Sequence, residues 1–187
     1  MRFAIIHPNG SGTADSNWQP WLKKQLQDMG HEVICPTMPD SKNARSSIWL
    51  PYMHDTMKID RDTVIVGHSS GAVAAMRYAE QYRIKASILI GVCYTDLDDE
   101  DEKISGYYDD MWDWQKIRSN QDFVVVMAGS DDPWVPIDEA RHVYSSLQAE
   151  YHEYPDKGHF FTEHMGGKTN FPELLQIIKN HIGNEDH

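Results

Sequence analysis

The stretch TVIVGHSSGAVAAMRYAEQY, from Thr63 to Tyr82, restricts the fold of this chain more than any other segment. A short β-branched run ends at the sequence GHSSG, and an alanine-rich, helix-favouring segment follows it without a spacer. In a Gly-x-Ser-x-Gly turn between a strand and a helix, the glycines leave room for close backbone contacts, and the serine hydroxyl is held clear of the backbone. The pattern predicts a nucleophile elbow with Ser69 at its centre.

Apolar runs of strand length alternate with helix-compatible segments along the whole chain, with no internal repeat and no long linker. The expected strands are Arg2–Ile6, His31–Cys35, Thr63–Val66, Ala86–Val92, Phe123–Met127 and Tyr151–Tyr154. Such alternation predicts the α/β class, with about six mostly parallel strands flanked by helices on both faces. We expect one domain spanning residues 1–187, with its ligand at the carboxyl ends of the strands.

Composition limits the partners of the chain. A formal net charge of −12 over 187 residues argues against nucleic acid or an anionic membrane surface, and favours a neutral or cationic small molecule. No apolar stretch is long enough to span a membrane, and the amino terminus lacks a signal-peptide core, so we expect a cytoplasmic protein. The two cysteines, Cys35 and Cys93, form no disulfide framework or metal motif. The acidic run at 96–102 is expected to be a solvated loop.

Residues suited to acyl transfer follow three of the expected strands. Ser69 follows the third, two aspartates follow the fifth, and His159 follows the sixth, which is the chain order of the α/β-hydrolases. A serine hydroxyl needs a base to take its proton, and a carboxylate fixes the tautomer of that histidine. Asp131 and Asp132 compete for the acid role. We favour Asp132, which directly precedes Pro133, and expect Asp131 to cap the next turn or helix.

An oxyanion hole needs two converging backbone N–H groups. Ser70 is expected to supply one, and Asn9, or less favourably Gly10, the other, because Pro8 has no N–H.

Three further residues are candidates for the substrate pocket. They are His68, Trp112 and Trp114. His68 lies inside the elbow, where packing or orientation of the turn is the favoured role. For the tryptophans, packing of the irregular 94–120 segment onto the body is the alternative to lining a pocket.

Motifs spread along the chain resemble those of the retinoblastoma-binding serine hydrolases, a family of small lidless α/β-hydrolases. The matching motifs are Trp18-x-x-Trp21, Met38-Pro39-Asp40, Ala44-Arg45-x-Ser47-Ile48-Trp49-Leu50-Pro51, the elbow with Ala72, Ala75-Met76-Arg77-Tyr78-Ala79-Glu80, Ser105-Gly106-Tyr107, Trp112-x-Trp114, Asp131-Asp132-Pro133 and Gly158-His159-Phe160. The resemblance implies an α/β-hydrolase fold with Ser69, Asp132 and His159 as nucleophile, acid and base. The Leu-x-Cys-x-Glu motif of the animal protein is missing, so binding of retinoblastoma-type proteins is not expected.

The leading functional hypothesis is hydrolysis of a small carboxylic ester or amide through an acyl-enzyme on Ser69, without a metal or other cofactor. A hydrolase-shaped binding protein with little turnover is one alternative. Acyl transfer to an acceptor other than water, with the same residues, is another.

Overall fold

A single parallel sheet runs through the computed structural model, which describes residues 1–10 and 12–183. Within these residues it contains six strands in the order β2-β1-β3-β4-β5-β6. The strands are β1 (Arg2–Ile6), β2 (Glu32–Ile34), β3 (Thr63–His68), β4 (Ala86–Ile90), β5 (Phe123–Gly129) and β6 (Glu150–Tyr154). Every neighbouring pair is parallel. The predicted fold class is therefore confirmed.

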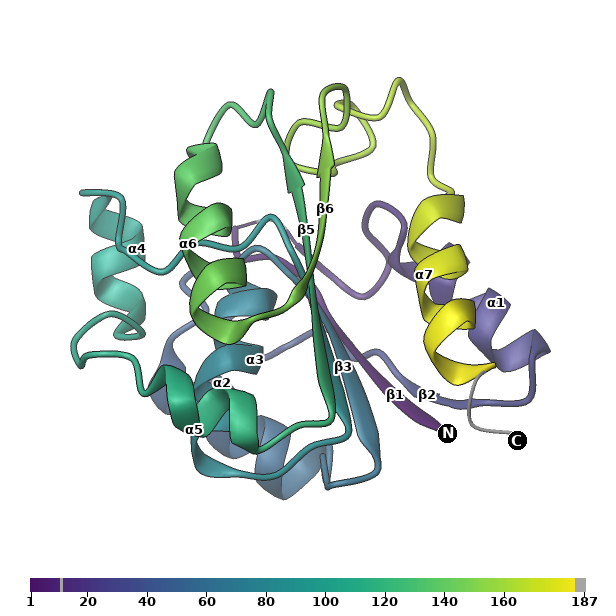
Figure 1. Cartoon of the computed structure of the whole chain (residues 1–187), viewed down its shortest axis with the longest axis horizontal. Coiled ribbons are helices and arrows are strands. Elements are labelled where there is room, and N and C mark those ends of the chain that lie inside the picture. Colours follow the sequence, from purple (N-terminus) through teal and green to yellow (C-terminus); the bar gives the residue numbers. More distant parts are fainter. Residues whose placement is uncertain (11, 184–187) are drawn as a thin grey trace.

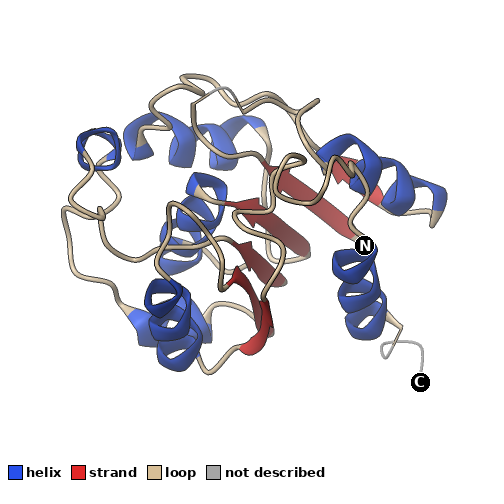
Figure 2. Cartoon of the chain, turned by 90° about the horizontal axis from the view of Figure 1, so that it is seen from above, coloured by secondary structure: helices blue, strands red, loops and turns tan. Residues whose placement is uncertain are grey.

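Helices cover both faces of the sheet (Figure 1). One face carries α1 (Gln19–Asp28) and α7 (Pro172–Ile182). The other carries α2 (Ser46–Pro51), the π-helix η1 (Tyr52–Thr56), α3 (Ser70–Gln81), α5 (Trp114–Ser119) and α6 (Ile137–Leu147). The short α4 (Glu100–Ser105) lies farther out on this second side, and Figure 2 shows the same three layers from above. No helix in the described part of the chain is long and apolar enough to cross a membrane.

Each central strand supplies side chains to two hydrophobic cores, one on each side of the sheet. In β1, Phe3 and Ile5 enter the core beneath α1 and α7, whereas Ala4 and Ile6 enter the core beneath α3. Every residue of β3 is buried. Burial on both faces explains why these strands appear in the sequence as unbroken apolar runs.

The order of the strands reverses between β1 and β3. The chain passes from β1 outward to β2 and then returns to the other side of β1, where Ile6 pairs with Gly67. Loops that leave the carboxyl ends of two strands at such a switch point diverge and leave a crevice between them. The loop containing Asn9 and the elbow containing Ser69 both begin there.

One local expectation needs correction, and one helix begins at a residue set by its backbone. α2 begins only at Ser46, because Ala44, two positions before it, adopts a left-handed conformation with φ of 48°. The acidic run was expected to be a loop, but its second half forms the first turn of α4. The Asp99 side chain accepts hydrogen bonds from two N–H groups of that turn, and acidic residues there also interact favourably with the helix dipole.

Candidate active site

Ser69 occupies the sharp turn between β3 and α3. Its backbone has φ 54° and ψ −119°, a conformation that is strained for a residue with a side chain. The Ser69 N–H donates to the carbonyl of Ile90 at 2.8 Å, which continues the pairing with β4 beyond the last residue of β3. Its own carbonyl accepts from Ala72 and Val73 in the first turn of the helix. Hydrogen bonds of both the N–H and the carbonyl of Ser69 therefore stabilise this strained conformation.

The two glycines of the elbow are sites of close backbone approach. A Cβ at Gly67 would lie 2.4 Å from the carbonyl oxygen of Gly71, and a Cβ at Gly71 would lie 2.3 Å from that of Ile6. Both distances are far below contact, and backbone atoms cannot move aside as a side chain can. The elbow therefore packs directly on the end of β1.

His159 and Asp132 form a buried pair beside the elbow. Nδ1 of His159 donates to Oδ2 of Asp132 at 2.6 Å, and each side chain is 3% exposed. The other carboxylate oxygen accepts the backbone N–H groups of Trp134 and Val135 at 2.9 and 3.0 Å. Burial alone would raise the pKa of Asp132, but the hydrogen bond and charge of His159 and the two N–H groups together lower it.

Asp131 takes a different partner from the one expected. Its Oδ1 accepts the N–H of Gly158 at 2.8 Å, across the gap between the loops that follow β5 and β6. The expectation that it would cap the following turn or helix was therefore wrong. The adjacent carboxylates hold consecutive residues of the same loop, Asp131 the backbone of Gly158 and Asp132 the imidazole of His159.

A cavity of about 510 Å³ opens at the carboxyl end of the sheet and contains both Ser69 and His159 in its wall. Its apolar part includes Leu97, Trp134 and Phe161. Its acidic part consists of Asp99, Asp101 and Glu102, from the amino-terminal end of α4. The lining of the cavity thus combines apolar and aromatic side chains with three carboxylates.

The hydrogen bonds of the oxyanion-hole candidates distinguish Asn9 from Gly10. Ser70, at the start of α3, lines the cavity, as do Asn9 and Gly10. The N–H of Gly10 already donates to the carbonyl of Lys42 at 3.1 Å, which removes it as a donor to a ligand. The side-chain amide of Asn9 donates to Oε1 of Glu102 at 3.1 Å. The loop after β1 is thereby tied to α4.

Comparison with known proteins agrees with this arrangement. Residues 4–180 match the family model described as serine hydrolase. The chain is 40% identical over 180 residues to the rat (Rattus norvegicus) protein named serine hydrolase RBBP9, covering 95% of this chain and 94% of that protein. The chain belongs to the serine hydrolase family. The predicted family resemblance is confirmed, and the protein is an enzyme of the hydrolase class.

Solved structures support the fold of this serine hydrolase. The product of the ydeN gene of B. subtilis superposes with a TM-score of 0.86 at 25% identity, covering 97% of this chain and 98% of that one. The meta-cleavage product hydrolase CumD of Pseudomonas fluorescens gives a TM-score of 0.69 at 15% identity, with 100% and 92% covered. A structure from a study of carboxylesterases of Nitrososphaera gargenis superposes with a TM-score of 0.71 at 14% identity, covering 97% of this chain and 89% of that one.

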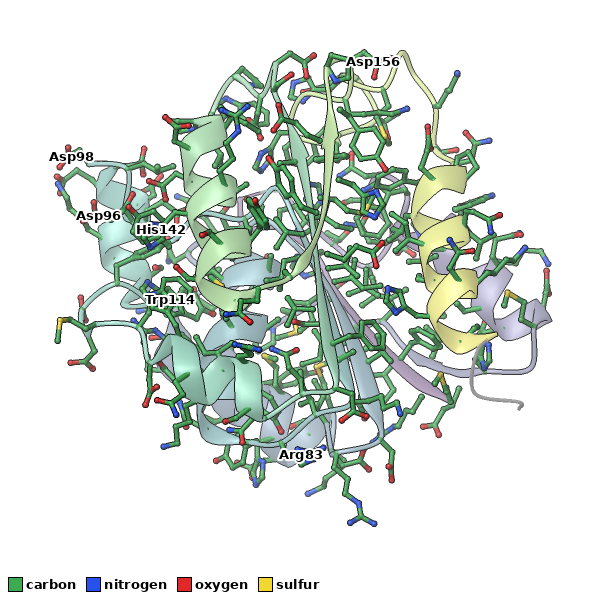
Figure 3. The ribbon with its side chains drawn as sticks, in the orientation of Figure 1. Arg83, Asp96, Asp98, Trp114, His142 and Asp156 are labelled. Atoms are coloured by element: carbon green, nitrogen blue, oxygen red, sulfur yellow. The ribbon has the colours of Figure 1, made fainter. Side chains whose placement is uncertain are left out.

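The three candidates for the substrate pocket do not line the cavity of this serine hydrolase. His68 is fully buried, and its Nε2 donates to the carbonyl of His159 at 2.7 Å. The guanidinium carbon of Arg77 lies 3.7 Å from the ring centroid of Trp112, and the Trp112 ring stacks on that of Trp114. Trp114 approaches His142 between α5 and α6, on the outer side of the helical layer in Figure 3. Neither tryptophan lines the cavity, so packing is their observed role.

Sequence reasoning missed the residues that do line the cavity beside the serine. Trp134 follows Asp132 by two positions, and Phe161 follows His159 by two, so proximity along the chain was an available signal for both. Glu102 was hidden within the acidic run. Cys93 also lines the cavity, and burial raises the pKa of its thiol, which keeps the sulfur protonated and unreactive.

Proposed function

We propose that this serine hydrolase cleaves small carboxylic esters or amides through an acyl-enzyme on Ser69, with His159 as the base and Asp132 as the acid. The observation that carries the proposal is the 2.6 Å contact between His159 and Asp132 in the wall of the cavity that also contains Ser69. A base oriented by a buried carboxylate next to a strained serine is the arrangement that serine acyl transfer requires.

The reaction proceeds in two halves. His159 takes the proton of the Ser69 hydroxyl as the oxygen attacks the substrate carbonyl carbon, and then gives that proton to the leaving alcohol or amine as the C–O or C–N bond breaks. In the second half His159 takes a proton from water, whose oxygen attacks the acyl carbon. The proton returns to the Ser69 oxygen as the carboxylic acid leaves. Asp132 keeps a proton on Nδ1 of His159 throughout, so that Nε2 is free to accept.

We assign stabilisation of the negatively charged oxygen of the tetrahedral intermediate to the backbone N–H groups of Ser70 and Asn9. Ser70 begins α3, so the positive end of the helix dipole adds to its hydrogen bond. Asn9 is favoured over Gly10 because the N–H of Gly10 donates to Lys42.

The cavity favours short substrates without a negative charge. At about 510 Å³ it accommodates a small acyl or aromatic group against Trp134 and Phe161. The three carboxylates in the lining repel anionic substrates and accept neutral or cationic ones. Because the sequence lacks a Leu-x-Cys-x-Glu motif, we do not propose a retinoblastoma-type protein as its partner.

Labelling with a fluorophosphonate probe tests the proposal, because the probe phosphonylates only a serine activated by its base. We expect labelling of the folded protein and its loss in Ser69→Ala. Ser70→Ala is the matched control, since it removes a neighbouring hydroxyl but keeps the backbone N–H, and it should remain labelled. A folded wild-type protein that stays unlabelled would favour the binding-protein alternative.

A panel of ester and amide substrates with acyl chains from two to twelve carbons tests the substrate class. Turnover should be greatest for the short chains, and the corresponding substrates with a carboxylate should be poor. Turnover that rises steadily to twelve carbons would contradict the assignment of a small pocket.

A further inference from the structure

The loop that carries His159 leaves the sheet before it reaches the histidine. The last strand, β6, ends at Tyr154, and Asp156, labelled in Figure 3, lies just beyond it at the carboxyl end of the sheet. Both neighbours of His159 have left-handed backbones, with φ of 49° at Gly158 and 59° at Phe160. A segment in such conformations keeps its position only where its surroundings hold it.

Two other histidines hold the backbone of His159. Its N–H donates to Nδ1 of His164 at 3.0 Å. Its carbonyl accepts from Nε2 of His68 at 2.7 Å. One imidazole thus serves as an acceptor and the other as a donor, and both peptide groups flanking the base are bound to a ring.

These contacts fix the protonation state that each ring must have. His68 carries its proton on Nε2, and burial, followed by the nearby charge of His159, lowers its pKa to about 3, so it stays neutral over the working range of an enzyme. His164 accepts at Nδ1, which is possible only while that nitrogen is unprotonated. Its side chain is 20% exposed.

The groups around His164 hold its ring in place. Glu163, on the same loop, places Oε1 3.9 Å from Nε2, and Asp131, from the loop after β5, binds the adjacent Gly158. The rings of Trp134 and Phe161 pack against the imidazole, with centroids 4.9 and 5.9 Å away. Nδ1 itself faces the N–H of His159, so a protonated ring would set two donors against each other.

We propose that His164 is a positioning residue for the catalytic base, because its Nδ1 accepts the backbone N–H of His159 and so fixes where that backbone lies. The inference rests on the proposed function of His159. His164 acts on the placement of the base and exchanges no proton with the substrate.

Three proteins test the proposal: the wild type, His164→Ala and His164→Asn. The side-chain oxygen of asparagine lies as many bonds from the backbone as Nδ1 of histidine, so it replaces the acceptor without a group that titrates. The readout is the rate constant of fluorophosphonate labelling at Ser69, which needs no knowledge of the natural substrate. At pH 8 we expect His164→Ala to react about tenfold more slowly and His164→Asn to react at close to the wild-type rate.

Rescue by asparagine separates positioning from a purely structural role. If His164 only filled space, the smaller asparagine would not restore the rate, whereas an acceptor for the His159 N–H restores it whichever side chain supplies it. Circular dichroism checks that all three proteins remain folded.

The possible failures are distinguishable. An unlabelled wild type would overturn the proposed function. A labelled wild type with His164→Ala equally fast, or with His164→Asn as slow as His164→Ala, would overturn only the role of His164.

Discussion

The carboxylate of Asp132 lies 2.6 Å from Nδ1 of His159, and its second oxygen receives two backbone N–H groups from its own turn. The carboxylate is therefore fixed from one side by the backbone and presents its other oxygen to the imidazole. Asp131, the preceding residue, is directed to the N–H of Gly158 instead. The two aspartates differ in what they bind, and this difference makes them separable by substitution.

Replacement of Asp132 by asparagine should lower kcat by about 10³- to 10⁴-fold, because an amide that donates to Nδ1 favours the tautomer with its proton on Nε2, which cannot accept the serine proton. The measurement is kcat on a short-chain ester. Asp131→Asn is the control. Its side-chain oxygen can still accept the Gly158 N–H, so its kcat should stay within about tenfold of the wild type. A larger loss from Asp131→Asn would reverse the assignment of the acid.

Replacement of Gly71 by alanine should lower the free energy of unfolding by about 3 kcal/mol or more, because the new methyl group would lie 2.3 Å from the backbone oxygen of Ile6. Urea denaturation gives the measurement. Gly30→Ala is a suitable control, since nothing lies within 4 Å of the added atom and only its left-handed backbone, with φ of 85°, opposes the change. That variant should lose about 1–2 kcal/mol. Equal losses would show that close approach at the elbow is not the constraint.

The elbow was predictable because its determinants are local. A β-branched run, two glycines around a serine and an alanine-rich helix specify strand, turn and helix within a few residues, and the structure has β3, Ser69 and α3 at those positions. The pairing of β1 with β3 was not specified in this way. The alternation of strands and helices along the chain predicted a parallel sheet, but it did not predict the order of the strands and therefore not this pair.

The cavity wall was not predictable because it depends on where long connections come to rest. Trp112 and Trp114 are aromatic residues of the kind that often line pockets, yet Trp112 packs against Arg77 and Trp114 against His142. Glu102 looks like one of several solvated acids, but α4 turns it inward toward Asn9, 93 positions earlier in the sequence. Such a contact cannot be inferred from spacing.

The free energy of unfolding should decrease as the pH is lowered, because of His68. Its pKa is 6.5 in an unfolded chain and about 3 when buried, so below pH 6.5 the unfolded chain takes up a proton that the folded chain does not. The resulting loss in the free energy of unfolding approaches about 1.4 kcal/mol per pH unit. Urea denaturation between pH 7 and 4.5 should show this slope.

His68→Gln isolates that contribution. A glutamine amide can still donate to the carbonyl of His159 but does not titrate, so the variant should lose stability less steeply as the pH falls. Part of the slope should remain, because burial also lowers the pKa of His7. Identical slopes in wild type and variant would exclude His68 as the cause.

Glu102 should support turnover by holding the loop that contains Asn9. Glu102→Ala removes the partner of both the Asn9 amide and the Tyr108 hydroxyl, and a small shift of the oxyanion loop should lower kcat by about tenfold. The matched control is Asp101→Ala, which removes a neighbouring carboxylate of the same cavity without touching Asn9. Steady-state kinetics on a neutral ester is the measurement. Similar kcat losses in both variants would indicate a general charge effect.

Replacing Trp134 should affect mainly catalysis, whereas replacing Trp114 should affect mainly stability. Trp134 lines the cavity and is 51% exposed, so Trp134→Ala should lower kcat/KM on an aromatic ester by about tenfold through lost apolar contact, with little change in stability. Trp114 packs between Trp112, Tyr94 and His142, so Trp114→Ala should cost about 2 kcal/mol of unfolding free energy and leave kcat/KM within about twofold. Kinetics and urea denaturation of both variants provide the comparison. A loss of kcat/KM in a stable Trp114→Ala protein would restore this tryptophan to the substrate pocket, where its sequence context first suggested it.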